Sequence, residues 1–487
     1  MSTNVNTNIE KNSYVKLVAE ENQLDYETAY EIMSSIKSKY KITFSEFAKN
    51  KLINYSGDEL TVKIKEIKAK KKRKRDYAIK KIAESTGWTE EYTREEVKRI
   101  KKEFNISART YWLRELYNKT DEEILEYKEK SKETKTKRIE KIKEITGWTE
   151  EKINDHVAYC NANFNVHSME YYMNFKCWDL TDDELCTFAV DEDSRLLSSI
   201  YNKEPVVLNN KLKFNHTFKE FLGRKYWCNQ NTSFDEFKEF TQGLTKIFCK
   251  PLTLSMGVGT KVFEIPQDEA ALKTIYDELM EDSKILAEEF IVQHEKMNEM
   301  YAGCVNTVRF TMLRESDTCH KLWSFVRFGS NGIVDNFHGG GMAAAVDVNT
   351  GIIISDALNA EGKYFTHHPV SGVQFRGFQI PHWDKLIEIT EKAMTSQNLV
   401  NYVGWDIAIC PDKVVIVEGN ATPQVGVYQS ILAPTKVGQK PLYEKFLPKP
   451  EPPVQKKVDV PKKEKTSAEP PKQKQSLFSR IRKKLKL

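Results

Sequence analysis

The chain carries the same hexapeptide twice, and this duplication restricts the folds that its N-terminal part can adopt. Thr-Gly-Trp-Thr-Glu-Glu occupies residues 86–91 and again residues 146–151, 60 positions later. Each copy is followed by a matching Phe-Asn and Tyr pattern and then by a Ser/Thr-x-x-Glu helix-start signal, at 104–111 and 164–171 and then at 120–123 and 181–184. A weaker copy lies within residues 40–59. We therefore predict an all-α helical repeat region over residues 1–195, built from three degenerate copies.

Such a region would serve as a spacer or as an array that binds a protein partner. The basic run Lys68–Arg75 lies between predicted helical segments. It indicates either a solvated helix face or a contact with an anionic surface or a nucleic acid. The net charge of +5 is small for 487 residues, so nucleic acid is not an expected partner.

Composition and cysteine usage restrict where the chain works. It is 40% hydrophobic and 30% charged, with a mean hydropathy of -0.58, which predicts at least one good core together with polar helix or unfolded tail. No run of about 18 apolar residues exists to span a bilayer, and the polar N-terminus does not resemble a secretory signal. None of the eight cysteines forms a C-x-x-C pair, so neither a zinc site nor a disulfide framework is expected. These features favour a cytoplasmic protein.

The texture of the sequence changes near Val206, where short β-branched and aromatic runs begin to alternate with helical stretches. We predict an α+β domain over residues 196–447 with a substantial antiparallel sheet. The expected strands are residues 246–249, 305–313, 321–328, 351–355, 406–409 and 414–418.

The C-terminal residues are expected to lack a core. Residues 448–475 are rich in proline, lysine and glutamate, which is typical of a disordered linker. Residues 476–487 place Leu477, Phe478, Ile481 and Leu485 at helical spacing among basic residues. This basic amphipathic helix would suit an anionic membrane surface, so the protein could be peripheral at the inner face of the membrane. The alternatives are a frayed tail or a helix that binds a protein partner.

The strongest chemical signal is a predicted hairpin whose two apolar strands flank a turn at residues 411–413. Its strands could bring Asp406 near Glu418 and Asn420, and the latter two share one face because they are two residues apart. Two carboxylates and an amide oxygen are hard donors that suit Mg²⁺ held jointly with nucleotide phosphates. The alternative is a hairpin whose acidic residues are merely solvated.

Two upstream segments add a candidate phosphate site. A strand ends at Lys250 and is followed by a small-residue loop that contains Gly257 and Gly259. Such a loop lets backbone N–H groups approach phosphate while the lysine supplies a charge. Glu288 and Glu289 form an acidic pair that we expect to enter a strand, where backbone groups could bind an adenine edge. A simple turn and a solvated acidic pair are the alternatives.

These elements together resemble the ATP-grasp superfamily. More closely, residues 207–429 resemble the sugar-transfer-associated ATP-grasp family. The resemblance rests on residues 208–211, 249–251, 306–309, 327–329, 335–341, 368–369, 404–406 and 418–420, and it covers about half of the chain. The N-terminal repeats and the tail lie outside it.

The resemblance implies two α+β subdomains that clamp ATP, and transfer of the γ-phosphate to a carboxylate that an amine then attacks. By position, Lys211 and Lys250 would contact the phosphates, and Glu288 or Glu289 would lie at the adenine hinge. Asp406, Glu418 and Asn420 would hold Mg²⁺. The two arginines that would neutralise charge on the transferring phosphoryl group are Arg309 and Arg327. Asp335, Asn336 and His338 would lie in a loop that covers phosphate or touches substrate.

The implied cofactors are ATP and Mg²⁺, and the implied substrates are a small carboxylate and an amine or sugar acceptor. We expect a carboxylate–amine ligase that decorates a surface polysaccharide or its sugar precursor. One alternative is an ATP-grasp kinase that phosphorylates a sugar or alcohol. Another is a non-catalytic nucleotide-binding scaffold.

Overall fold

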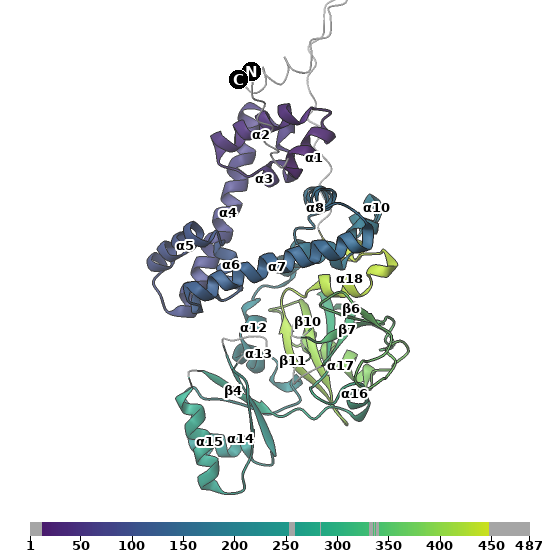
Figure 1. Ribbon diagram of the computed structural model, residues 1–487. Helices are drawn as coiled ribbons and strands as arrows, with labels where there is room; N and C mark the ends of the chain where they lie inside the picture. Colours follow the sequence, from purple (N-terminus) through teal and green to yellow (C-terminus); the bar gives the residue numbers. More distant parts are fainter. Residues whose placement is uncertain are drawn as a thin grey trace, which may run out of the picture. The chain divides into compact units, whose positions relative to one another are not determined.

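The computed structural model describes residues 12–252, 259–282, 284–330, 335, 337 and 340–447 (Figure 1). The described residues form two compact units, one up to Tyr172 and one from Met173 onward. The linker predicted at 448–475 and the helix predicted at 476–487 lie outside the described residues. So do three residues with predicted roles: Gly257, Asn336 and His338.

The helical region, whose last elements extend past Tyr172, begins with α1 (Ser13–Glu21) and then follows one succession of elements that recurs along the chain. A helix of 15 residues comes first, a helix of six residues follows, and a short 3-10 turn ends each copy. The 15-residue helices are α2 (Tyr26–Tyr40), α5 (Glu90–Phe104) and α8 (Glu150–Phe164). The six-residue helices are α3 (Phe44–Lys49), α6 (Ala108–Leu113) and α9 (Met169–Asn174), and the 3-10 turns are η1 (Leu52–Asn54), η2 (Leu116–Asn118) and η3 (Cys177–Asp179).

The duplicated hexapeptide forms a corner between two helices. Gly87 ends α4 (Gly57–Thr86) in the left-handed conformation, with φ 74°, and its N–H donates to the Ala83 carbonyl. Thr89 then caps α5 by accepting from a backbone N–H. Gly147, which ends α7 (Asp121–Thr146) with φ 68°, and Thr149 repeat these roles. Glycine is required at this corner because it adopts a positive φ without steric cost.

Each copy buries equivalent positions in its own small core. The position occupied by Phe47 in the first copy is Tyr111 in the second and Tyr172 in the third, and all three side chains are buried. The two tyrosines carry a hydroxyl that must be satisfied inside the core. Tyr172 meets it with His156 Nδ1 at 2.7 Å. The middles of α4 and α7 contribute no buried side chain over residues 65–77 and 125–138, so they are solvated helices between the copies.

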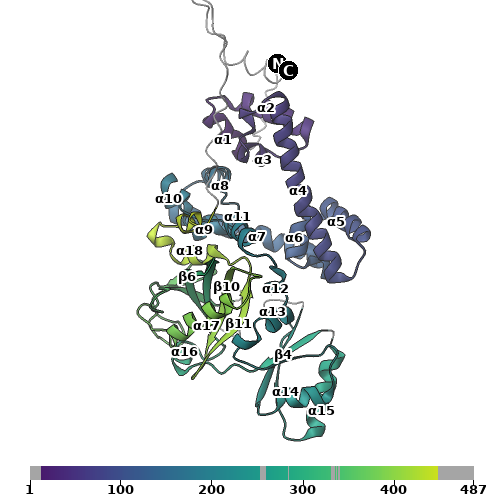
Figure 2. The same ribbon diagram turned by 180° about the vertical axis from the view of Figure 1, so that it is seen from behind.

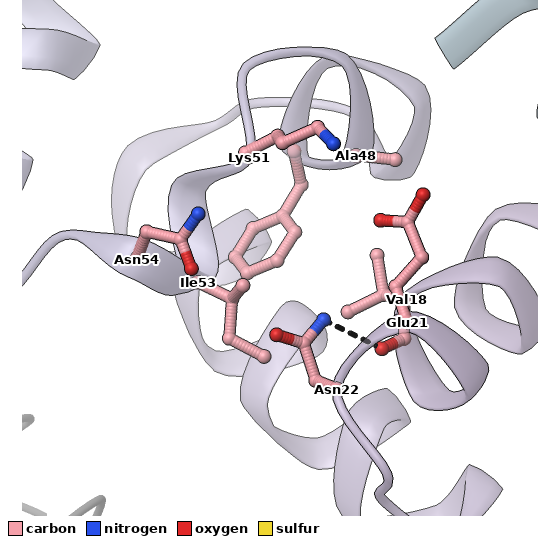
Figure 3. A pocket seen from close by; sticks show the side chains of 8 residues that line it. Val18, Glu21, Asn22, Ala48, Lys51, Ile53 and Asn54 are labelled. Atoms are coloured by element: carbon pink, nitrogen blue, oxygen red, sulfur yellow. Dashed lines mark hydrogen bonds between the residues drawn. The ribbon is translucent and has the colours of Figure 1, made fainter. Parts of the chain in front are cut away.

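The first copy contains a small pocket of about 360 Å³, seen in Figure 3. It is lined by Val18, Glu21 and Asn22 from the end of α1 and by residues from α3 to η1. The Asn22 amide donates to the Val18 carbonyl at 2.8 Å, and Glu21 accepts from Asn163 at 3.1 Å. Asn22 and Glu21 are therefore already used in packing the helices together.

The C-terminal unit starts with short helices that lead into a four-stranded antiparallel sheet of order β1-β4-β2-β3. These helices are α10 (Asp182–Cys186), α11 (Asp191–Tyr201), α12 (Val206–Asn209), α13 (Lys211–Thr217) and the turn η4 (Lys219–Phe221). The strands are β1 (Tyr226–Cys228), β2 (Lys246–Pro251), β3 (Lys261–Glu264) and β4 (Ile285–Glu289). The helices α14 (Phe234–Thr241) and α15 (Glu269–Glu281) share a core with this sheet, around Trp227 and Phe237.

A second antiparallel sheet has seven strands in the order β11-β10-β5-β6-β7-β8-β9. They are β5 (Thr307–Glu315), β6 (Thr318–Phe328), β7 (Met342–Val346), β8 (Ala357–Asn359), β9 (Tyr364–Phe365), β10 (Tyr402–Ile409) and β11 (Val414–Asn420). The remaining elements are α16 (Glu295–Met300), α17 (Trp383–Thr395), α18 (Val425–Ile431), the turn η6 (Ala433–Thr435) and α19 (Lys440–Glu444). Because α17 belongs to a core cluster with Phe310 and α18 to another with Trp323, the sheet is packed on both faces. Figure 2 shows the same elements from behind.

The predicted all-α region followed by an α+β domain with antiparallel sheets is confirmed. The strand predicted at residues 351–355 was wrong, because Ile352 and Ile353 form only isolated bridges there. The acidic pair was also misplaced, since Glu288 and Glu289 end β4 rather than enter a strand. Among the described residues, no helix combines the length and the apolar character needed to cross a bilayer. All eight cysteines are free thiols.

Candidate functional site

The hairpin of β10 and β11 aligns the three predicted metal ligands through a β-bulge. Ile407 pairs with Ile416, but the next pair is Asp406 with Glu418, so Val417 is an extra residue on β11. In a regular ladder Asp406 would pair with Val417, and Glu418 would face the opposite side of the sheet. The bulge instead places Glu418 directly across from Asp406 and Asn420 across from Gly404. Bulges re-aim side chains in this way and are frequent beside functional sites.

Both predicted arginines bind Asp406. Arg309 lies opposite Asp406 on the neighbouring strand β5, and its Nε and Nη2 donate to the two carboxylate oxygens at 2.5 and 2.9 Å. Arg327 on β6 reaches Asp406 Oδ2 with its Nη2 at 3.0 Å. Asp406 is almost fully buried. Burial opposes its ionisation, but the charges of Arg309 and Arg327 outweigh it and hold the pKa of Asp406 well below its usual range.

The surroundings of Glu418 disfavour its ionised form, in contrast to those of Asp406. Burial and the neighbouring charge of Asp406 raise the pKa of Glu418, while Lys250 and Arg309 oppose the rise. The two sheets of the C-terminal unit approach each other beside Glu418, because Arg224 donates to Glu288 on β4 at 2.7 Å and to the Val417 carbonyl on β11 at 2.9 Å.

The phosphate-binding candidates lie around a buried carboxylate on the four-stranded sheet. Lys250 on β2 forms an ion pair with Glu288 Oε2 at 2.6 Å, and Arg224 forms one with Oε1 at 2.7 Å. Asn215 donates to the same Oε1 at 3.0 Å. Burial works against the charge, yet Arg224 and Lys250 together lower the pKa of Glu288 to about 2.

Lys211 joins this group from the first turn of α13. Its Nζ donates to the Pro251 carbonyl at 2.9 Å, close to Lys250 along the chain. Burial and the positive charge of Lys250 lower the pKa of Lys211, and the carboxylates Glu418 and Glu288 act in the opposite direction. Gly259, the described glycine of the small-residue loop, has a φ of +73°.

Glu289 occupies a different environment from its neighbour Glu288. Its carboxylate accepts from the Lys225 backbone N–H at 3.0 Å and lies 3.6 Å from Lys413 Nζ. It lines a groove of about 300 Å³ between the end of β4 and the turn that joins β10 to β11. The structure thus separates the two glutamates that the sequence left as alternatives. Glu288 belongs to the lysine cluster, and Glu289 belongs to the groove.

Arg224 is the residue that the sequence analysis missed. Besides Glu288, it binds the backbone carbonyls of Ile416 and, at 2.9 Å, Val417. Those carbonyls lie at the bulge, where the regular ladder is interrupted and backbone groups need another partner. Arg224 therefore connects the carboxylate of one sheet to the bulge of the other. It follows Gly223, whose φ is +68°, but no motif in the sequence sets this arginine apart from the chain's other basic residues.

Two further predicted loop residues are placed by the structure. Asp335 accepts from the Thr307 backbone N–H at 3.0 Å and lies 3.5 Å from Arg327 Nε, beside the arginine cluster. His368, which lies in the motif at residues 368–369, is buried. One ring nitrogen, Nε2, lies 2.8 Å from the Gly329 carbonyl, so His368 holds the end of β6 against its own loop.

The candidate site fits a magnesium ion by its donor types. Asp406, Glu418 and Asn420 supply carboxylate and amide oxygens, which Mg²⁺ prefers. Within the described residues, no three histidine, cysteine, aspartate or glutamate side chains converge on one point. A cation held here would therefore depend on the Asn420 amide and on phosphate oxygens to complete its shell, as is usual for Mg²⁺ at nucleotide sites.

Residues 230–436 match the family described as sugar-transfer associated ATP-grasp. Similar solved structures include D-alanyl-alanine synthetase A from Vibrio cholerae (10% identity, 49% of this chain and 64% of that chain, TM-score 0.32) and the ATP-grasp ligase PsnB with its minimal precursor (11%, 50% and 62%, TM-score 0.30). Another is the L-amino acid ligase from Bacillus licheniformis (12%, 46% and 43%, TM-score 0.28). The chain thus spans less than two thirds of each of these proteins.

The comparison with curated proteins found no match. Over residues 230–436, somewhat less than half of its length, this chain is similar to the sugar-transfer associated ATP-grasp family.

Proposed function

We propose that the C-terminal unit is an ATP- and Mg²⁺-dependent ligase that activates a carboxylate as an acyl phosphate and joins it to an amine. The observation that carries this proposal is the meeting of the two sheets beside Glu418, where Arg224 binds both Glu288 of one sheet and the Val417 carbonyl of the other. Phosphoryl transfer requires positioning and positive charge more than covalent participation by the protein. The site offers both.

The charge balance supports a triphosphate with its metal as the ligand. Five basic side chains gather here, which are Lys211, Arg224, Lys250, Arg309 and Arg327, against the four carboxylates of Glu288, Asp335, Asp406 and Glu418. An excess of cations in a buried site is costly unless an anion is bound. When bound, Mg²⁺ would bridge phosphate oxygens and screen the approach of an anionic carboxylate.

Each predicted residue has a proposed role in this scheme. Asp406, Glu418 and Asn420 would hold the cation, and Lys211 and Lys250 would hold the phosphates. Arg309 and Arg327 would share their charge between Asp406 and the transferring phosphoryl group. The groove at Glu289 is the proposed adenine end, because it begins where β4 leaves the sheet.

The substrate class is proposed from the family's description as sugar-transfer associated. The acceptor would be an amino sugar or an amine-bearing glycan precursor, and the product a surface polysaccharide decorated through an amide bond. The basic segment 476–487 would hold the enzyme at an anionic membrane. Loss of vesicle binding on truncation after residue 447 would support that part of the proposal, and unchanged binding would refute it.

The test is release of ADP by the full-length protein with Mg²⁺-ATP, screened against mixtures of amino acids and amino sugars, with hydroxylamine present. An acyl phosphate is trapped by hydroxylamine as a hydroxamate, whereas a phosphorylated alcohol is not. Carboxylate-dependent ADP release with hydroxamate formation is the expected result. ADP release that requires only a hydroxyl acceptor and gives no hydroxamate would identify a kinase instead.

Glu418→Gln is the diagnostic variant and Glu264→Gln its control. Loss of a buried charge at the reacting centre should lower the rate by about 10²–10³-fold. Glu264 lies on β3, is exposed and forms an ion pair with Lys246 at 2.6 Å, so its variant should retain full activity. Equal activity of Glu418→Gln and wild type would remove the proposed role of this residue. ATP binding without turnover in any substrate mixture would favour a nucleotide-binding scaffold.

A further inference from the structure

A buried serine on α11 binds the segment that follows the proposed cation ligands. Ser194 lies in the first turn of α11 and is 2% exposed. Its hydroxyl donates to the Pro423 carbonyl at 2.9 Å. Pro423 comes three residues after Asn420, in the segment that joins β11 to α18. The helix α11 lies against α18 and β10 within the C-terminal unit (Figure 2).

This bond is unusual for a hydroxyl inside a helix. Serine and threonine within helices commonly donate to the carbonyl four residues earlier. The buried Thr93, Thr390 and Ser430 all do so, at 2.7–2.9 Å. Ser194 instead donates to a residue 229 positions away in the chain. Its hydroxyl therefore serves a contact between distant segments rather than its own helix.

Ser194 is the last member of a chain of four buried donors. Trp323 Nε1 donates to the Tyr443 hydroxyl at 3.2 Å. The Tyr443 and Tyr402 hydroxyls lie 2.9 Å apart, and the Tyr402 hydroxyl lies 3.0 Å from Ser194 Oγ. An indole N–H only donates and a carbonyl only accepts, so Tyr443 must donate to Tyr402 and Tyr402 to Ser194. We call these four residues the donor chain.

The donor chain has one direction and leaves no proton unused. All four side chains are buried, where a hydroxyl without a partner would be costly. Burial also raises the pKa of Tyr402 to about 12, so this hydroxyl keeps its proton at neutral pH. The Pro423 carbonyl is thus the final acceptor of a fully satisfied buried network.

The helix that carries Ser194 is fixed at both ends. Before its first turn, Gln429 of α18 binds both the N–H and the carbonyl of Ala189 at 2.8 Å. After its last turn, Asn202 accepts from the Tyr402 backbone N–H and donates to the Tyr402 carbonyl, both at 2.8 Å. Because both ends are held, α11 presents the Ser194 hydroxyl at one defined place.

Pro423 in turn packs against residues of the candidate site. A Cβ on Gly404 would lie 2.8 Å from Pro423 Cγ and 3.1 Å from Arg309 Cδ. The proline ring, the glycine backbone and the arginine side chain therefore lie together. Gly404 also pairs with Asn420 across the hairpin. A shift of Pro423 would thus alter the surroundings of both Arg309 and Asn420.

We propose that Ser194 is a positioning residue of the ligase, which holds Pro423 and, through Pro423, the Arg309 side chain. This inference rests on the proposed function of the site. Arg309 would act on charge that develops in the transition state, so its displacement should lower kcat more than it weakens ATP binding. Ser194 and Tyr443 lie outside residues 230–436. The active enzyme would therefore include α11 and α19 as well as the matched residues.

The first part of the test is hydrogen exchange of the full-length protein in peptides that cover residues 421–428. The Val425 N–H there donates to the Pro423 carbonyl at 3.0 Å, and Ser194→Ala should speed exchange in this segment by at least about fivefold. The matched control is Ser198→Ala, one turn further along α11. Ser198 is 6% exposed, but its Oγ accepts from Asn202 at 3.2 Å instead of binding the segment. Unchanged exchange in Ser194→Ala would overturn the proposal, whether or not the protein is a ligase.

The second part measures ADP release at saturating Mg²⁺-ATP with the carboxylate and amine mixtures used to test the proposed function. We expect kcat of Ser194→Ala to fall about 10- to 100-fold, with KM for ATP within about twofold of wild type. Ser198→Ala should keep both values. Faster exchange with an unchanged kcat would refute the positioning role and leave the ligase function intact. No ADP release by the wild-type protein would count against the proposed function instead, and exchange would still decide whether Ser194 holds the segment.

A double-mutant cycle tests the donor chain itself. Tyr402→Phe removes the bond before Ser194 and leaves the bond to Pro423 in place, so its kcat should fall less than that of Ser194→Ala. The double variant should be no slower than Ser194→Ala alone, because Tyr402 reaches Pro423 only through Ser194. Losses that multiply in the double variant would show that the two hydroxyls act independently, which would overturn the chain.

Discussion

Replacing Glu288 with glutamine should destabilise the four-stranded sheet by about 3 kcal/mol. The substitution keeps the shape of the side chain but leaves Arg224 and Lys250 facing each other without the buried carboxylate between them. The pKa of Glu288 falls from its ordinary 4.5 to about 2, and 1.36 kcal/mol per pKa unit gives roughly 3 kcal/mol for the ionised form. Removal of one partner from a buried ion pair typically costs 3–5 kcal/mol or so, which agrees.

The pH dependence has a definite sign. The folded protein holds Glu288 ionised to lower pH than the unfolded chain does, so this stabilisation is present in full above about pH 4.5. It is lost progressively as the pH falls toward about 2. The stability difference between wild type and Glu288→Gln should therefore be about 1 kcal/mol or more smaller at pH 3.5 than at pH 7.

The assay is urea unfolding in the absence of nucleotide, read by hydrogen exchange in peptides that cover β2 and β4. These peptides report on the sheet itself, while peptides from α5 serve as an internal reference. Glu289→Gln is the matched control, because its side chain is partly exposed and its partner Lys413 is 3.6 Å away. The control should cost less than about 1 kcal/mol. A Glu288→Gln variant that is as stable as the control, with no change between the two pH values, would refute the reasoning.

Three further outcomes follow from buried residues in the seven-stranded sheet and in a loop packed against it. Gly419→Ala should lower the free energy of unfolding by about 1–3 kcal/mol, because a Cβ there would lie 2.9 Å from Phe214. Thermal unfolding measures this change, and an unchanged midpoint would show that the surrounding side chains shift to accommodate the methyl group. Phe310→Ala should cost about 3–5 kcal/mol in urea unfolding, since the ring is fully buried, and a loss below about 1 kcal/mol would contradict this packing. Burial lowers the pKa of His368, so below about pH 6.5 the unfolded chain takes up the proton first and stability falls. A His368→Gln variant should lack this decline between pH 7 and pH 5.5, and a parallel decline in both proteins would assign it elsewhere.

The sequence was informative wherever a local signal determined local structure. The hexapeptide at 86–91 combines a glycine that stops one helix with a threonine that starts the next, so its repetition predicts repeated corners. The hairpin around residues 411–413 was likewise readable, because two apolar runs flank a turn. The residue types at Asp406, Glu418 and Asn420 predict a cation site, because carboxylate and amide oxygens are ligands that Mg²⁺ prefers.

The sequence was uninformative where the outcome depends on contacts between distant segments. Arg224 lies 192 residues from Ile416, whose carbonyl it binds, and no local pattern encodes that contact. The burial of His368 depends on Gly329, 39 residues away. Glu288 and Glu289 face opposite sides of β4. Which of the two faces the other sheet depends on how the sheets pack, and the alternation of residues along one strand does not determine that packing.

The bulge at Val417 makes the candidate site depend on chain length as well as on residue identity. Eleven residues separate Asp406 from Glu418, and the extra one among them decides which side of the sheet Glu418 faces. A chain that lost Val417 would keep every oxygen donor and still turn Glu418 toward the opposite core. Related sequences could therefore be sorted by the number of residues between the aspartate and the glutamate. A chain that has the same residue types but one residue fewer between them would be expected not to bind the cation.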